Sequence, residues 1–367
     1  MPADVFMTDL RARRGQGLLE KLDRLFERAG FGELIAPNDL VAIKLHFGER
    51  GNLAHIRPQY LRRIVEKVKA RGGKPFLTDA NTLYVGSRAN AVDHLQTAIE
   101  NGFAYAVVGA PLVIADGLNG KDYVSVEINQ PHFQTVKIGS AIYHANALLV
   151  VSHFKGHELS GFGGAIKNLG MGSGSRAGKQ MMHSDVLPRV NQEKCTGCAL
   201  CTRWCPTQAI TVVDKKAGID ESKCIGCGEC TVTCLVGAIK ISWKTTPEAM
   251  QEKMTEYALG AIKDKAGKVG YISFLTNISP DCDCCGWNDA AVVGDIGILA
   301  SRDPVAIDQA AVDLVNQQPV LPGSVLAGRE NCPDIFKAIH QGIDWSVQLA
   351  YGERIGLGTR QYNLIRV

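Results

Sequence analysis

Eight cysteines between residues 195 and 234 follow one spacing twice, C-x2-C-x2-C-x3-C, and the second copy starts 29 residues after the first. Three cysteines two residues apart can hold three corners of one [4Fe–4S] cubane, while the fourth faces the cluster of the other copy. Glycines within the copies let the backbone approach the sulfides. The spacing therefore assigns a first cluster to Cys195, Cys198, Cys201 and Cys234, and a second cluster to Cys224, Cys227, Cys230 and Cys205.

The cysteine segment resembles the bacterial two-cluster ferredoxins over residues 190–243. Leu235 stands where those proteins usually have a proline after the fourth cysteine, and this exchange removes no ligand. A zinc module is the alternative, but zinc sites use C-x2-C pairs that are separated by a longer gap. The resemblance implies two [4Fe–4S] clusters and a redox protein or ferredoxin as the electron donor.

A second group of reactive residues lies before the cysteines, in the stretch SHFKGHELSGFGGAIKNLGMG from Ser152 to Gly172. It follows a predicted buried strand, at the end where α/β proteins place their ligand-binding loops. Glycines allow a backbone to approach a ligand closely. The alternative is a flexible glycine-rich connector. The expected catalytic residues are His157, Lys167, His183 and, after an earlier strand, His46. The expected cofactor-binding residues are Gly161, Gly163, Gly164 and Asn168.

A third group is the sequence DCDCC, from Asp281 to Cys285. Three thiols this close together can bind a soft metal ion, and Cys282 and Cys284 would share a face in an extended stretch. The alternative is that these cysteines are small buried hydrophobic residues. The sequence therefore raises the hypothesis of an additional metal ion, with Cys282, Cys284 and Cys285 as its ligands.

Strands alternate with helices along the rest of the chain, which predicts an α/β fold with a parallel sheet. The predicted strands cover residues 40–45, 76–78, 104–108, 148–151, 268–274 and 292–299, with a hairpin at 124–128 and 134–138. The predicted helices cover residues 18–29, 57–71, 91–101, 247–264 and 304–315, the last with Asp303 as its N-cap. We expect an α/β body of two lobes in residues 1–189 and 244–367, with a ferredoxin-like α+β module inserted at 190–243.

Composition narrows the class of protein. The 367 residues are 46% hydrophobic and 21% charged, as in soluble globular proteins, and the net charge of +3 is not clustered, so we expect no nucleic acid partner. The longest apolar run, at residues 145–152, is too short to span a bilayer, and the N-terminal residues lack a secretory signal. We therefore expect no membrane partner and a cytoplasmic location. In such a reducing compartment, 12 cysteines indicate metal or redox chemistry.

Several motifs carry a resemblance to one family, the Fe–S centre proteins known as the domain of unknown function 362 family. They are the stretch SHFKGHELSGFGGAIKNLGMG with the cysteine repeats, TDANTLYVGSRANAVDHL, PDCDCCGW and DIGILASRDPVAID. The resemblance covers almost the whole chain. It implies a fold and cluster content, and no settled activity.

The order His157, G-F-G-G, Lys167, His183 is also similar to that in the nickel-pincer lactate racemases. In that family the lysine anchors the pincer nucleotide and the later histidine ligates nickel. The resemblance implies these roles for Lys167 and His183. HFGERGN stands where the racemases have a T-R-P nucleotide-binding element, so the resemblance implies a shared fold before a shared cofactor.

Three hypotheses follow for the function. The first is an oxidoreductase in which the clusters deliver electrons to a small-molecule substrate bound in the α/β body. The second is an electron carrier or docking module without catalysis of its own. The third is a metal- or cofactor-handling protein in which DCDCC and the histidines hold a metal.

Overall fold

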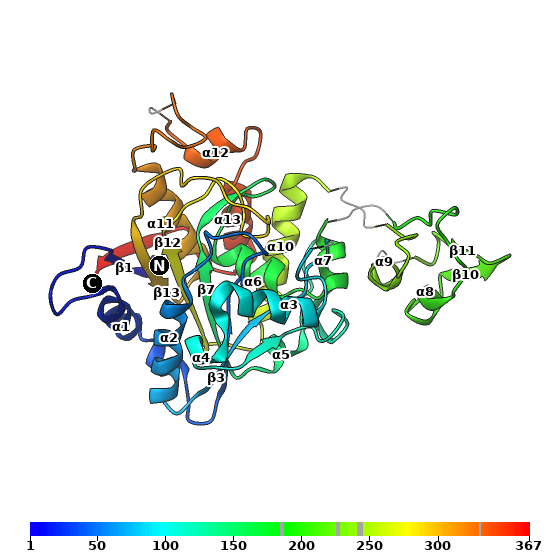
Figure 1. Ribbon diagram of the computed structural model, residues 1–367, viewed down its shortest axis with the longest axis horizontal. Helices are drawn as coiled ribbons and strands as arrows, with labels where there is room; N and C mark the ends of the chain where they lie inside the picture. Colours follow the sequence, from blue (N-terminus) through cyan, green and yellow to red (C-terminus); the bar gives the residue numbers. More distant parts are fainter. Residues whose placement is uncertain (85, 184–186, 225–227, 241–244, 330–331) are drawn as a thin grey trace.

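Figure 1 shows the computed structural model, which describes residues 1–84, 86–183, 187–224, 228–240, 245–329 and 332–367. Within these ranges eight strands form one sheet, in the order β14-β1-β13-β12-β7-β2-β3-β4. Neighbouring strands are parallel, except where β13 pairs with β1 and β12. The predicted α/β class is therefore confirmed. The strands are β1 (Ala3–Asp9), β2 (Leu40–Lys44), β3 (Lys74–Asp79), β4 (Leu112–Ile114), β7 (Ala147–His153), β12 (Val269–Leu275), β13 (Gly297–Ser301) and β14 (Tyr362–Arg366).

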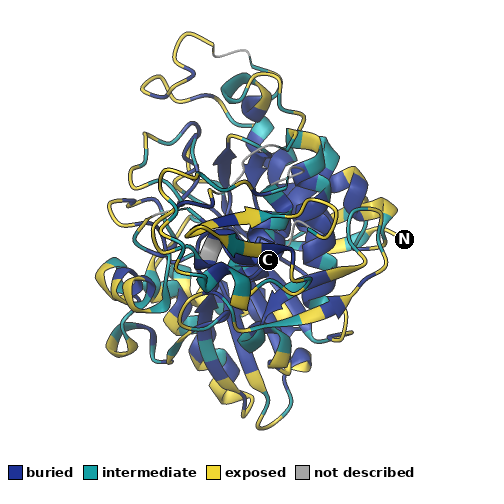
Figure 2. Ribbon diagram, turned by 90° about the vertical axis from the view of Figure 1, so that its right-hand side faces the viewer, coloured by how far each residue is buried: buried dark blue, intermediate teal, exposed yellow. Residues whose placement is uncertain are grey.

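Helices cover both faces of the sheet. Side chains alternate along a strand, so Val41 and Ile43 of β2 face one core while Ala42 faces the other. The first core includes α1 (Leu18–Arg28), α2 (Pro58–Ala70) and α3 (Ala91–Ala98). The second includes α6 (Ala165–Ser173), α10 (Pro247–Ile262) and α11 (Pro304–Asn316). Figure 2 shows the sheet and the helix faces toward it as buried, with exposed residues on the outside.

Smaller elements complete the body. A hairpin of β5 (Tyr123–Glu127) and β6 (Thr135–Gly139) lies where a hairpin was predicted. The other elements are α4 (Tyr105–Val108), α5 (Ser140–His144), α7 (Arg176–His183), α12 (Ile335–Ile339), α13 (Ser346–Arg354), a 3₁₀ turn (Phe31–Leu34), a π turn (Ile99–Phe103) and the hairpin of β8 (Lys155–His157) and β9 (Gly161–Gly163). The carboxylate of Asp303 accepts hydrogen bonds from the backbone N–H groups of Val305 and Ala306, so its predicted role as an N-cap is confirmed.

The prediction of a strand at residues 104–108 is wrong, because these residues form the short helix α4. Gly109, at φ +74°, ends that helix. Arg62 of α2 donates hydrogen bonds to the carbonyl oxygens of Ala106 and Val107, at 3.2 and 3.1 Å. Tertiary contacts with α2 therefore override the β preference of this sequence. The strand that pairs with β3 follows at β4.

Two other segments also differ from expectation. The strand predicted at residues 292–299 starts only at Gly297, and Val293 instead forms an isolated bridge with Val320. The glycine-rich stretch forms the β8–β9 hairpin and the helix α6, with α7 directly after it. Its glycines leave room for other parts of the chain: a Cβ on Gly170 would lie 2.0 Å from the carbonyl oxygen of Met254, and one on Gly156 would lie 1.8 Å from that of Pro280.

The cysteine segment lies at one end of the molecule, on the right of Figure 1. Its described elements are α8 (Leu200–Arg203), the hairpin of β10 (Ile210–Val213) and β11 (Lys216–Ile219), and α9 (Glu229–Thr233). Its own small core contains Ile210, Ala217 and Ile239 together with cysteine side chains. Throughout the described part of the chain, every helix is too short or too polar to cross a membrane.

The close contact between α6 and α10 gives a test of the fold. Alanine normally stabilises a helix relative to glycine by about 1 kcal/mol. We expect Gly170→Ala to destabilise the protein by about 2 kcal/mol instead, because the new methyl group would meet a backbone carbonyl that cannot rotate away. Urea unfolding measures the change. Gly294→Ala, where a Cβ would meet nothing within 4 Å, is the control. A Gly170→Ala protein as stable as the control would contradict the packing described for α6.

Candidate functional site

A cavity of about 210 Å³ lies beside the ends of β2 and β3. In parallel α/β sheets this end of the strands is where ligands bind. The walls come from the segments after these strands, from the β8–β9 region, from α6 and α7, and from the loop after β12. The described lining residues are Lys44, His46, Asp79, Ala80, Thr82, Leu83, Tyr84, Arg88, Lys155, His157, Glu158, Leu159, Lys167, Asn168, Met171, Gly172, Lys179, His183 and Cys284.

The four expected catalytic residues, His46, His157, Lys167 and His183, all line this one cavity although they are far apart in the sequence. Of the expected cofactor-binding residues, Asn168 lines it as well. Its side chain accepts a hydrogen bond from Lys44 Nζ at 2.7 Å and donates to the carbonyl oxygen of Val151 at 3.0 Å. Asn168 therefore connects α6 to β2 and β7.

The other three expected cofactor-binding residues, Gly161, Gly163 and Gly164, are not part of the described cavity lining. A Cβ on Gly161, which has φ +72°, would lie 2.6 Å from Trp345 Cβ, and one on Gly163 would lie 2.9 Å from Lys167 Cδ. A Cβ on Gly164 would lie 2.2 Å from Asp308 Oδ1. These positions bring protein groups close together, and Gly164 makes room for the carboxylate that accepts hydrogen bonds from Ala165 and Ile166 at the start of α6.

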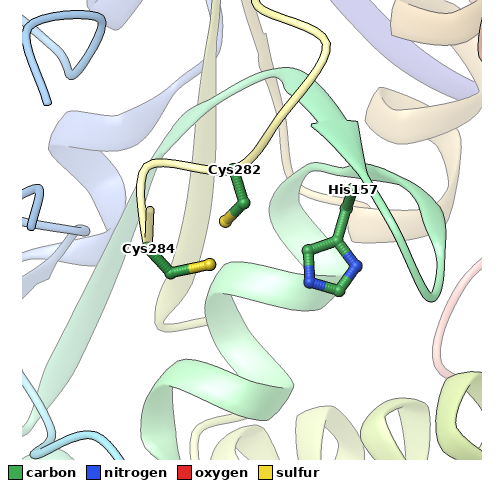
Figure 3. A group of neighbouring side chains, drawn as sticks. All are labelled: His157, Cys282 and Cys284. Atoms are coloured by element: carbon green, nitrogen blue, oxygen red, sulfur yellow. The ribbon is translucent and has the colours of Figure 1, made fainter. Parts of the chain in front are cut away.

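Three side chains in or next to the cavity lining can supply ligands to one metal ion. A ring nitrogen of His157 and the sulfur atoms of Cys282 and Cys284 lie within 4.8 Å of one another. Figure 3 shows the two thiols from the loop after β12 pointing toward each other, with the imidazole of β8 beside them. Cys285 lies outside this group, and its thiol contacts Cys284. One imidazole and two thiols are a ligand set suited to a soft or borderline metal.

The cysteine loop is attached to the β7–β8 region through Asp283. His153 Nδ1 lies 2.8 Å from Asp283 Oδ1, and Lys155 Nζ lies 3.4 Å from its other oxygen. Burial alone would raise the pKa of Asp283, but these two groups hold it well below its usual range. The backbone N–H of Gly156 also donates to the carbonyl oxygen of Ser279, at 2.9 Å.

The imidazole of His157 is held by its neighbours. Ser160 Oγ lies 2.9 Å from Nδ1 of His157 and donates a hydrogen bond to the carbonyl oxygen of Phe162. The hydroxyl oxygen can therefore accept a hydrogen bond from Nδ1, which leaves Nε2 for a metal. The backbone N–H groups of Leu159 and Ser160 approach Nδ1 at 3.3 and 3.2 Å and favour the opposite tautomer. Burial lowers the pKa of His157 well below its usual value, so the imidazole is neutral, whichever ring nitrogen carries its proton.

Burial also lowers the pKa of His183 to about 4 and that of His46 well below its usual value. All three cavity histidines are therefore neutral near pH 7. Lys167 is the opposite case. Burial disfavours its charge, but Cys282 and Cys284 raise its pKa, and its Nζ lies 3.1 Å from Cys282 Sγ. The site thus combines neutral imidazoles with a charged ammonium group beside the thiols.

A buried ion network forms another part of the cavity wall. Asp79 lies 3.0 Å from Lys44 Nζ and 3.4 Å from an Arg88 nitrogen, and Arg88 also contacts Glu49 at 3.3 Å. Lys44 and Arg88 were not among the expected site residues. Lys44 is a charged residue within an otherwise apolar predicted strand, and this exception to the pattern could have indicated that it belongs to the site. Arg88 lies within the motif TDANTLYVGSRANAVDHL, but its position there did not indicate a place in the cavity wall.

The cysteine repeats form two groups, each around a small cavity. Cys195, Cys198, Cys201 and Cys234 line one, and Cys205, Cys224 and Cys230 line the other. Cys227 lies outside the described residues. Backbone N–H groups donate to sulfur in both groups, from Ala217 to Cys195 at 3.3 Å, from Ala238 to Cys234 at 3.2 Å and from Ala209 to Cys205 at 3.2 Å.

Helix α7 connects the second cysteine group with the large cavity. On one side, a Cβ on Gly228 of the cysteine segment would lie 2.4 Å from Gln180 Cγ of α7. On the other side, Lys179 and His183 of the same helix line the large cavity. Glu229 also accepts hydrogen bonds from Tyr123 Oη, at 2.8 Å, and from Lys137 Nζ, at 3.0 Å, which holds α9 against the β5–β6 hairpin.

Comparisons with known proteins identify the family. The family model described as Domain of unknown function (DUF362) matches residues 41–313, and this confirms the resemblance seen in the sequence motifs. No curated protein matches the chain.

Nine chains of solved structures match this chain, among them the two that follow. The lactate racemase apoprotein from Thermoanaerobacterium thermosaccharolyticum has a TM-score of 0.38 and 14% identity, and the match covers 74% of this chain and 50% of that one. A protein from Thermotoga maritima has a TM-score of 0.36 and 11% identity, covering 76% and 54%. The chain thus spans about half the length of each. Because the family match includes both the cavity and the cysteine repeats, the chain belongs to the family described as Domain of unknown function (DUF362).

Proposed function

We propose that the protein is an iron–sulfur oxidoreductase, in which two [4Fe–4S] clusters in residues 190–243 deliver electrons to the cavity of the α/β body. The observation that carries this proposal is the position of α7, which contacts the second cysteine group through Gln180 and lines the cavity through Lys179 and His183. A helix with its side chains is about 10–12 Å across. The two sites are therefore separated by about one helix diameter, a short distance for electron transfer.

The cysteine groups fit the proposed clusters. Each of the two cavities is lined by cysteines of one interleaved set and by members of both repeats, as the ligand pattern of two-cluster ferredoxins requires. The N–H···S hydrogen bonds at Cys195, Cys205 and Cys234 stabilise sulfur in its thiolate form, which is the form that binds metal. When bound, the clusters would supply single electrons.

The first cysteine group suits electron entry. Cys198 is exposed, whereas Cys230 in the second group is buried beside the body. A redox protein or ferredoxin would therefore donate electrons at the first group, and the second group would lie between it and the cavity. This order is consistent with the contacts of α9, since Glu229 and Thr231 face the body.

In the cavity, His157, Cys282 and Cys284 would hold a metal ion that supplies Lewis-acid or redox chemistry. Lys167 lies beside Cys282, where its charge offsets the negative charge that thiols gain when they lose protons to bind metal. The same ammonium can stabilise negative charge that develops on a reduced substrate. His183 and His46 are neutral. Each can therefore bind a ligand or accept a proton through a ring nitrogen more readily than it can donate a proton.

The ligand group also favours a second candidate function. A metal- or cofactor-handling protein would need a soft-metal site and no substrate turnover, and His157, Cys282 and Cys284 meet the first requirement. Such a protein would bind and release its metal reversibly. The two candidates differ in whether electrons from the clusters reach the cavity.

The cluster assignment can be tested with pairs of alanine variants in anaerobically prepared protein. We expect about eight irons per chain in the wild type. Cys198→Ala with Cys234→Ala should retain about four irons, because both residues belong to one cluster although they lie in different repeats. Cys224→Ala with Cys234→Ala should lose nearly all iron. Stoichiometric zinc in place of iron, or the reverse pattern of the two pairs, would sink the assignment.

The cavity metal can be tested separately. We expect the wild type to bind one further metal ion, and Cys282→Ser with Cys284→Ser to lose it while the iron content stays unchanged, because these thiols are remote in sequence from the cluster ligands. Cobalt(II) binding, followed by thiolate charge-transfer absorption, measures occupancy. Cys332→Ser is the control, since that thiol bonds to the Asp334 carbonyl outside the cavity. Equal cobalt binding by all three proteins would exclude the site.

Electron delivery needs a measurement of distance. With cobalt(II) in the cavity, we expect electron paramagnetic resonance of the dithionite-reduced protein to show faster relaxation of a cluster signal, because the two centres lie about one helix diameter apart. The Cys282→Ser, Cys284→Ser protein should show no such change at the same cobalt concentration. Unchanged relaxation in cobalt-loaded wild type would place the clusters too far from the cavity, and the metal-handling function would then be the better one.

A further inference from the structure

The cavity contains more buried positive charge than its neighbours neutralise by direct contact. Five cationic side chains line it. Four of them lie within 4.0 Å of an acidic group or a thiol: Lys44 contacts Asp79, Arg88 contacts Asp79 and Glu49, Lys155 contacts Asp283, and Lys167 contacts Cys282.

Lys179 is the exception. It is 6% exposed, and among the described residues no carboxylate lies within 4.0 Å of its Nζ. Its ammonium group makes one hydrogen bond, to the carbonyl oxygen of Gly174 at 2.6 Å. Asp116 and Asp79 act on it only from a greater distance. Burial lowers the pKa of Lys179 to about 8, so its ammonium form costs free energy here, and an anion from outside the chain would stabilise that form.

The cavity lining also includes the apolar side chains of Leu83, Leu159 and Met171. A cavity volume of about 210 Å³ gives room for a short organic molecule.

We propose that the cavity binds a small organic monocarboxylate, with its carboxylate on Lys179 and its short hydrocarbon chain against Leu83, Leu159 and Met171. This inference rests on the proposed function, since it names the substrate class of the same cavity. It assigns a binding role to a lysine that the sequence motifs did not single out.

A phosphate group fits this cavity less well than a carboxylate. Phosphate carries up to two charges and three acceptor oxygens, and it favours helix N-termini and free arginine side chains. The N-terminal N–H groups of α6 already bind the Asp308 carboxylate. Arg88 is occupied by Asp79 and Glu49. One ammonium group beside an apolar wall matches one carboxylate with a hydrocarbon chain.

Isothermal titration of the full, cluster-containing chain tests the proposal. The probes are acetate, butanoate and hexanoate, with butanamide as the uncharged match of butanoate and inorganic phosphate as the other anion. We expect butanoate to bind at least tenfold more tightly than butanamide and phosphate. Lys179→Met should weaken butanoate at least tenfold, and the exposed Lys74→Met should leave it unchanged. If Lys179→Met does not fold, Lys179→Gln keeps a hydrogen-bond donor for Gly174 while it removes the charge.

Three results would overturn the proposal: equal binding of butanoate and butanamide, tighter binding of phosphate, or no binding of any of the three acids to the wild type. Butanoate binding that Lys179→Met and Lys179→Gln leave intact would also overturn it. The proposed redox function is judged by iron content, cobalt binding and cluster relaxation, so either idea can fail alone.

Discussion

The buried carboxylate of Asp283 is the interaction on which the candidate site depends. It lies between Cys282 and Cys284 in the chain, and it is fixed by His153 at the end of β7 and by Lys155 at the start of β8. A buried carboxylate must be paired, so the loop cannot move without exposing an unpaired charge. The backbone on either side of Asp283 therefore has one position, and this position brings both thiols to His157. Two contacts of Asp283, with His153 of β7 and Lys155 of β8, thus hold the loop that carries a group of soft ligands.

The same reasoning applies to the ion network around Asp79. Lys44 and Asp79 lie at the ends of the neighbouring parallel strands β2 and β3, and Asp79 also pairs with Arg88 from the segment after β3. Buried ion pairs rarely add net stability compared with apolar packing. Their value here is positional, because they hold charged groups at fixed places around a cavity without filling it. Lys179 differs from the other cations of the cavity lining: they contact an acidic group or a thiol, whereas Lys179 contacts a backbone carbonyl oxygen among the described residues, and from this difference we infer what the cavity binds.

The sequence predicted the parts of this protein that depend on short spacings. Cysteine spacing predicted which side chains share a small cavity, and periodicity predicted α2, α10 and α11. The expectation that ligand-binding residues follow strand ends selected His46, His157, Lys167 and His183, and these four residues line one cavity. It did not explain the glycines, since Gly164 and Gly170 make room for Asp308 and Met254 and not for a ligand. Such contacts join residues more than 80 positions apart, and a single sequence carries no signal for them.

Helix α7, which lies in the chain between the glycine-rich stretch and the cysteine segment, contacts both the cavity and that segment. Its eight residues are enough for two turns, so Gln180 can face the cysteine segment while Lys179 and His183 face the cavity. A longer connection would have left the segment free to move relative to the body. Here Glu229, next to the ligand candidate Cys230, is bound by Tyr123 and Lys137 of the β5–β6 hairpin. The second cysteine group is therefore held from two sides, and a fixed distance to the cavity is the property that electron delivery requires and that a freely exchanging carrier would not need.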